Sequence, residues 1–144
     1  MTRSISRRRL IAGALFAGLG FGSRTVWAGS YLDRAALLLY VADTEIDLLR
    51  RKLYDSELAR LVHQQAEARV HSASSMMVPP EVVQAHPHLL LMLENCERAA
   101  NSGVERKPPE FLKFLNLARD EEQLFRAIIK QLGWELPPVR EGLD

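Results

Sequence analysis

The sequence predicts an all-α protein, an antiparallel helical bundle with short connections between its helices. Residues 30–75 contain no glycine or proline and carry apolar residues at helical spacing throughout. Two later segments, 80–102 and 109–132, show the same spacing, and each begins at a pair of prolines. Leucine, alanine, glutamate and arginine, which favour helices, dominate the chain, whereas aromatic residues make up only 7% of it.

The first predicted helix covers residues 30–75, with Ser30 as its N-cap. Its apolar residues follow the three-four alternation of a coiled-coil seam. They are Leu32, Ala35, Leu39, Ala42, Ile46, Leu49 and Leu53. The alternation breaks at Tyr54-Asp55-Ser56, where either the helix continues through a stutter or Asp55-Ser56 caps a new helix after a tight turn. Because no glycine or proline marks a turn there, we expect one long helix.

The shorter helices at 80–102 and 109–132 carry their own punctuation. Pro87 predicts a kink or a new start at His86 within the first of them. Gly103 and Gly133 are the expected stops of the two helices, because glycine commonly ends a helix.

Residues 1–28 show the three zones of a cleavable export signal. A basic stretch from Arg3 to Arg9 is followed by an apolar run from Leu10 to Phe21 and a polar stretch that ends at Ala28. The apolar run is shorter than the roughly 20 residues that span a bilayer, so we expect cleavage after Ala28 and only transient contact with the membrane. The expected division is a signal at 1–28, a bundle domain at 29–136 and a flexible tail at 137–144.

The basic stretch, Ser6-Arg7-Arg8-Arg9-Leu10-Ile11, resembles the twin-arginine signal of the bacterial Tat export pathway, with Arg7 and Arg8 as the pair. Arg24 before the cleavage region is also similar to that pathway, whereas Leu10 stands where an aromatic residue is usual. The resemblance implies a bacterial protein exported already folded, often with a cofactor or a bound partner, to the periplasm or beyond. A Sec signal with an additional arginine is the alternative, and it leads to the same side of the inner membrane.

Charge and motifs exclude several classes of function for the bundle domain. Five of the 19 basic residues precede Ala28, so the rest of the chain carries 14 basic against 18 acidic residues, a net charge of −4. This balance argues against nucleic-acid binding, which needs a basic face. Cys96 is the only cysteine, so no intramolecular disulfide can form, and its position favours burial. We find no nucleophile elbow and no phosphate loop that would indicate an enzyme.

A continuous first helix would be about 65 Å long, against roughly 35 Å for each later helix. Its apolar seam would then need a second chain to cover it. The predicted interface to a homo-oligomer or hetero-partner consists of Leu32, Leu39, Ile46, Leu49 and Leu53. The leading hypothesis is therefore a small exported protein that acts by protein–protein interaction, as an accessory subunit or a self-associating module.

All four histidines fall within 26 residues around the first predicted loop. His63, Glu67 and His71 share one helical stripe, and antiparallel folding brings the later histidines level with acidic residues of the last helix. The candidate metal ligands are His63, Glu67, His71, His86, His88 and Glu122, with Glu121 at the same level. Imidazole and carboxylate from several helices suit a transition metal, so a metal-binding bundle of the ferritin-like kind is the alternative function. The competing interpretation is a solvated helix face, because no Glu-x-x-His motif is present.

Overall fold

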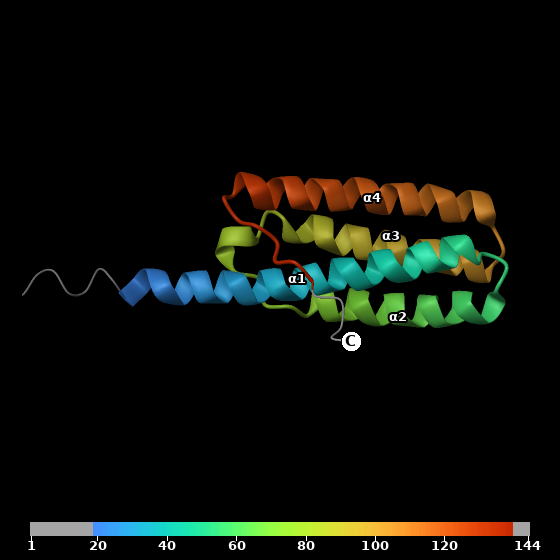
Figure 1. Ribbon diagram of the computed structural model, residues 1–144, viewed down its shortest axis with the longest axis horizontal. Helices are drawn as coiled ribbons and strands as arrows, with labels where there is room; N and C mark the ends of the chain where they lie inside the picture. Colours follow the sequence, from blue (N-terminus) through green and yellow to red (C-terminus); the bar gives the residue numbers. More distant parts are fainter. Residues whose placement is uncertain (1–18, 140–144) are drawn as a thin grey trace, which may run out of the picture.

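The computed structural model describes the backbone of residues 19–139 and the side chains of residues 28–139. Its four α-helices lie side by side (Figure 1): α1 (Leu19–Arg51), α2 (Ser56–Ser74), α3 (His86–Val104) and α4 (Pro108–Gln131). A short 3-10 helix, η1 (Pro80–Val82), lies between α2 and α3. Consecutive helices run in opposite directions, α3 packs against each of the other three, and residues 19–139 contain no strand. The predicted all-α helical bundle is confirmed.

The continuous helix expected over residues 30–75 is wrong, because the chain turns at residues 52–55 and forms two helices instead. The side chain of Asp55 is the N-cap of α2 and accepts a hydrogen bond of 3.0 Å from the backbone nitrogen of Leu58. In the turn itself, the N–H groups of Lys52 and Asp55 bond to the carbonyls of Leu49 and Lys52. The N-cap aspartate thus starts a new helix after a turn that contains no glycine or proline. The bundle has four helices rather than three.

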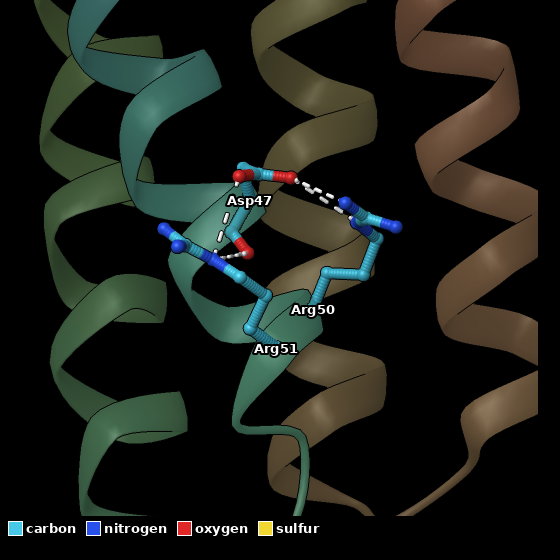
Figure 2. A network of polar contacts seen from close by, with 3 residues as sticks. All are labelled: Asp47, Arg50 and Arg51. Carbon is cyan, nitrogen blue, oxygen red and sulfur yellow. Dashed lines mark hydrogen bonds and ion pairs between the residues drawn. The ribbon is translucent and has the colours of Figure 1, made fainter.

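Charged side chains close the last turn of α1 (Figure 2). The Nε and Nη2 atoms of Arg50 donate hydrogen bonds of 3.1 and 2.8 Å to Oδ1 of Asp47, and Nε of Arg51 lies 3.6 Å from Oδ2. The hydrogen bond from Arg50 lowers the pKa of Asp47. The positive charges of Arg50 and Arg51 also lie at the negative end of the helix dipole, where they stabilise the C-terminus of α1.

The helix expected over 80–102 begins later, at His86, because η1 forms a separate turn before it. Pro87 lies in the first turn of α3, where its missing N–H sacrifices no helical hydrogen bond. The new start predicted at His86 is therefore correct. The helix expected over 109–132 agrees with α4 to within one residue at each end.

The two glycines have different roles. Gly133 follows α4 with a φ of 84°, in the left-handed region that favours glycine, and it is the stop that was predicted. Gly103 is not a stop, because it is buried inside α3, which ends one residue later. A Cβ atom there would lie 3.4 Å from Cδ2 of Leu49, so the glycine permits close contact between α3 and α1.

The apolar seam of α1 is buried within the single chain. Leu39 and Leu49 are completely buried, Leu32 and Ile46 are 3% exposed, and Leu53 packs half-buried against the same core. The turn at residues 52–55 folds α2 back along α1, and α3 covers the remaining side. The expected intermolecular interface through these five residues is therefore wrong, because they form the hydrophobic core.

The ends of the chain bear on the remaining sequence predictions. Arg7 and Arg8 lie outside the described residues, so the export signal stays a prediction, and α1 runs through Ala28, the expected cleavage position. None of the described helices is long and apolar enough to cross a membrane. After α4, Trp134 and Leu136 pack against the core, and the chain crosses beside α1 as far as residue 139 (Figure 1).

Core burial of the α1 seam predicts different effects for two leucines that lie two residues apart. Leu39→Ala should lower the free energy of unfolding by about 2–5 kcal/mol, because it leaves a cavity between helices. Leu37→Ala, at a side chain that is 53% exposed, should change it by less than about 0.5 kcal/mol. Urea denaturation followed by circular dichroism measures both. Similar small effects, with an unfolding midpoint that depends on protein concentration, would show that the seam is an interface.

Candidate metal centre

Polar side-chain contacts connect the helices around the bundle. Glu45 of α1 pairs with Arg69 of α2, and His63 of α2 with Glu97 of α3. His88 of α3 then pairs with Glu121 of α4. Asp43 of α1 completes the circuit by a side-chain hydrogen bond to Glu122 of α4. The histidines and acids singled out from the sequence thus take part mainly in separate interhelical pairs.

One of these pairs has a third member. Nε2 of His63 lies 2.7 Å from Oε1 of Glu97 and 3.7 Å from Oε1 of Glu67. One ligand atom from each of the three residues falls within 4.8 Å of the other two. The His63 and Glu97 side chains are 21% and 27% exposed, whereas that of Glu67 is 60% exposed. The group is therefore held by two half-buried residues and is open to solvent on the Glu67 side.

Helix geometry explains how the three residues meet. His63 and Glu67 are one turn apart on α2, a spacing that puts both side chains on the same face. Val62 and Ala66, their immediate predecessors, are buried in the core, so His63 and Glu67 lie at the edge of the buried face. Glu97 follows the buried Cys96 on α3 and reaches the same edge from the opposite helix. The group therefore lies along the contact between α2 and α3.

An imidazole nitrogen and two carboxylate oxygens form a ligand set for divalent transition metals such as Zn²⁺, Fe²⁺, Mn²⁺ or Co²⁺. Metal–ligand bonds of about 2.1 Å in tetrahedral geometry separate ligand atoms by roughly 3.4 Å. The 2.7 Å contact between His63 and Glu97 would open slightly, and the 3.7 Å contact to Glu67 would close. Three protein ligands would leave a coordination position for water. This group could hold a metal.

His86, another predicted ligand, has a structural role instead. Its Nδ1 atom is 2.8 Å from the hydroxyl of Tyr31, and its ring also bonds to the backbone of Ala73. Burial lowers the pKa of His86, which is 8% exposed, and burial also raises the pKa of Tyr31. A neutral imidazole that accepts from the Tyr31 hydroxyl and donates to the Ala73 carbonyl satisfies both ring nitrogens. His86 therefore joins α1 and α2 to the start of α3.

The other predicted ligands are also separated. Nδ1 of His88 lies 2.6 Å from Oε2 of Glu121, both side chains being partly buried, but no third candidate ligand joins this pair among the described residues. His71 is exposed near the end of α2. Nε and Nη2 of Arg126 donate hydrogen bonds of 2.9 and 2.7 Å to Oε1 of Glu122, whose side chain is 14% exposed.

Asp43 and Glu122 form a carboxyl pair between α1 and α4. Burial, the negative charge of Glu122 and the hydrogen bond to it raise the pKa of Asp43 to about 7, against the smaller opposing effects of Arg126 and Arg119. Two carboxyl groups can share a hydrogen bond only when one of them is protonated, and the raised pKa makes Asp43 the donor below about pH 7. Cys96 lies in the same interior, where burial raises the pKa of its thiol to about 12, and it is an unreactive core residue.

Of the six ligands predicted from the sequence, only His63 and Glu67 come together. Their partner Glu97 was not among the predicted residues, although the histidine–glutamate spacing on α2 indicated the correct face. No protein-family model, curated protein or solved structure matches this chain.

The proton shared by Asp43 and Glu122 predicts that the stability of the fold depends on pH. Since the folded pKa of Asp43 is raised, its stabilising contribution is complete below its unfolded value near 3.8 and is lost as the pH rises through about 7. Asp43→Asn keeps a donor towards Glu122 but does not titrate. Its melting temperature relative to the wild type should therefore increase between pH 5 and pH 8. A constant difference across this range, measured by differential scanning calorimetry, would contradict the shared proton.

Proposed function

We propose that this protein is an exported helical bundle that binds one divalent transition-metal ion through His63, Glu67 and Glu97. The observation that supports this proposal is the convergence of one imidazole and two carboxylates within 4.8 Å, across the contact between α2 and α3. Metal binding replaces protein–protein interaction as the leading hypothesis for the function, because the leucine seam on which the earlier hypothesis depended is buried.

The position of the group favours a single-metal centre over a ferritin-like one. Ferritin-like di-metal sites draw carboxylates and histidines from four helices into the middle of the bundle. Here the ligands come from two helices, and Glu67 is largely exposed, so an ion could exchange with solvent. Such an accessible centre with free coordination positions suits reversible binding of a metal, or activation of a bound water.

The N-terminal sequence supports an exported location. The resemblance of the residues around Arg7 and Arg8 to a twin-arginine signal implies export after folding, which allows a metal to be inserted before the protein leaves the cytoplasm. A bacterial periplasmic location fits this order of events.

Cobalt binding tests the metal centre. Purified without chelators or a histidine tag, the protein should bind one Co²⁺ per chain, seen by isothermal titration calorimetry and by visible absorption of the bound ion. His63→Ala and Glu97→Gln should each weaken binding by at least about tenfold, because each removes a ligand that the other two cannot replace.

His88→Ala is the matched control. It also removes a short histidine–glutamate contact between helices, of 2.6 Å, but the described structure gives that pair no third ligand. Co²⁺ affinity should therefore stay unchanged in this variant. Equal weakening by His63→Ala and His88→Ala would refute a specific centre and indicate loose binding to surface histidines.

Self-association is a second candidate function, favoured by one groove. Leu37 and Met77 are 53% and 63% exposed, and they line a cleft of about 450 Å³ with Arg34, Leu38 and Met76. This cleft lies between α1 and the end of α2, away from the buried seam. A second copy of the chain could dock its own apolar side chains here.

Sedimentation velocity tests self-association through this groove. The wild type should dimerise with increasing concentration, whereas Leu37→Glu should remain monomeric because a charge would enter the apolar contact. A wild type that is monomeric at all concentrations rules out this candidate and leaves the metal centre unaffected.

A further inference from the structure

The cleft between α1 and the end of α2, here called the α1–α2 cleft, has one charged lining residue, Arg34. Arg34 and Leu38 lie on one face of α1, one helical turn or about 6 Å apart. The other lining residues are apolar or carry a hydroxyl group: Leu37, Leu38, Ser72, Ser75, Met76 and Met77. The cleft therefore offers a cation beside an apolar surface.

The chain supplies no carboxylate to Arg34 in the part that the structure describes. Its Nε and Nη2 atoms donate hydrogen bonds of 3.3 and 3.0 Å to the carbonyl and the hydroxyl of Ser30, which are both uncharged. Arg50, Arg69 and Arg126, by contrast, each contact a carboxylate. An anion in the α1–α2 cleft would thus give Arg34 the charged partner that it lacks.

The end of α2 contributes donors to the cleft. The hydroxyl groups of Ser74 and Ser75 donate hydrogen bonds of 2.7 and 2.8 Å to carbonyl groups in the last turn of the helix. These bonds satisfy part of the negative end of the helix dipole, which would otherwise oppose an anion. The hydroxyl of Ser72 makes no hydrogen bond among the described residues, so it is a further donor for a ligand.

We propose that the α1–α2 cleft binds a medium-chain aliphatic carboxylate, with the carboxylate on Arg34 and the alkyl chain along the apolar lining. The carboxylate pairs with the guanidinium group and can also accept from Ser72. The alkyl chain removes apolar surface from water at Leu37 and Met77, which are 53% and 63% exposed. The volume of about 450 Å³ falls in the range of about 300–1,000 Å³ that small-molecule sites occupy.

This proposal goes beyond the metal centre and assigns a different occupant to the groove in which self-association is the second candidate function. An apolar surface from a second copy would cover Arg34 without neutralising it, and burial of an unpaired charge is costly. A ligand that joins a carboxylate to an alkyl chain satisfies both parts of the cleft. The two occupants exclude each other, so the carboxylate should dissociate any dimer that forms through this groove.

Titration of the protein with sodium octanoate at pH 7, below its micellar concentration, tests the proposal. Two-dimensional NMR spectra should show saturable shifts of residues 34–38 and 72–77, with a millimolar or lower dissociation constant. Butanoate should bind at least about tenfold more weakly, because each buried methylene group strengthens binding by up to about fourfold. Octylammonium, which has the same chain and the opposite charge, should not saturate the site.

Three variants separate the two parts of the site. Arg34→Gln should weaken octanoate binding by at least about tenfold, because it removes the charge-assisted contact. Leu37→Ala, which should leave the fold intact, should weaken it several-fold. Arg60→Gln is the matched control, because Arg60 also lines a cleft beside an exposed leucine, Leu61, but shares that cleft with Glu57. Octanoate affinity should stay unchanged in this variant.

Equal binding of octylammonium, unchanged binding by Arg34→Gln, or an equal loss in Arg60→Gln would each overturn the proposal and indicate detergent-like adsorption. A dimer that Leu37→Glu abolishes but octanoate does not dissociate would also overturn it, because a second copy would then occupy the cleft. His63→Ala should bind octanoate like the wild type, so a failure of the metal centre can be distinguished from a failure of this proposal.

Discussion

The rest of the fold depends on the chain reversal between α1 and α2, where the side chain of Asp55 accepts a hydrogen bond from the backbone nitrogen of Leu58. This bond stabilises the start of α2 at a turn that contains no glycine or proline, and the turn reverses the chain after α1. The reversal brings α2 along the leucine seam and converts a surface that would have needed a second chain into a core. It also lets α2 pack along α3, so that His63 reaches Glu97 across the contact between these two helices. Both the burial of the seam and the position of the candidate metal centre follow from this one reversal.

Pairing of charges explains why the remaining histidines and acids are dispersed. A half-buried charge is costly unless another group compensates it, so each helix places its polar residues against a partner on a neighbouring helix. Most of these contacts involve only two residues, as in the pair of His88 with Glu121. His63 differs because Glu67, one turn away on the same helix, adds a second carboxylate to its pair with Glu97. The metal centre is thus an interhelical pair with one further ligand.

The sequence predicted the helices better than it predicted how they face one another. Periodicity identified the bundle and the later helices, and the spacing of His63 and Glu67 gave one correct face. Folding the chain about Val78 places position 93 opposite His63, whereas the structure places Glu97 there, one helical turn further on. The connection between α2 and α3 contains η1 and is not a symmetric loop, so its midpoint could not be known. Folding the chain about Glu105 places position 122 opposite His88, whereas the structure pairs His88 with Glu121, one residue away. Each residue rotates a side chain by about 100° around the helix, so Glu122 contacts Asp43 instead.

The helices of the bundle contact one another to very different extents, which determines what a ligand between them can do. α2 and α3 pack closely along their length, so an ion on His63 and Glu97 adds to an interface that is already formed. α1 and α4 make little direct contact, and the carboxyl pair and residues 134–139 bridge the space between them. A bound ligand raises the free energy of unfolding by an amount that grows with the logarithm of the ratio of its concentration to its dissociation constant. A metal ion at the α2–α3 contact should therefore act chiefly through its own chemistry, whereas the α1–α4 side stays the least connected part of the bundle.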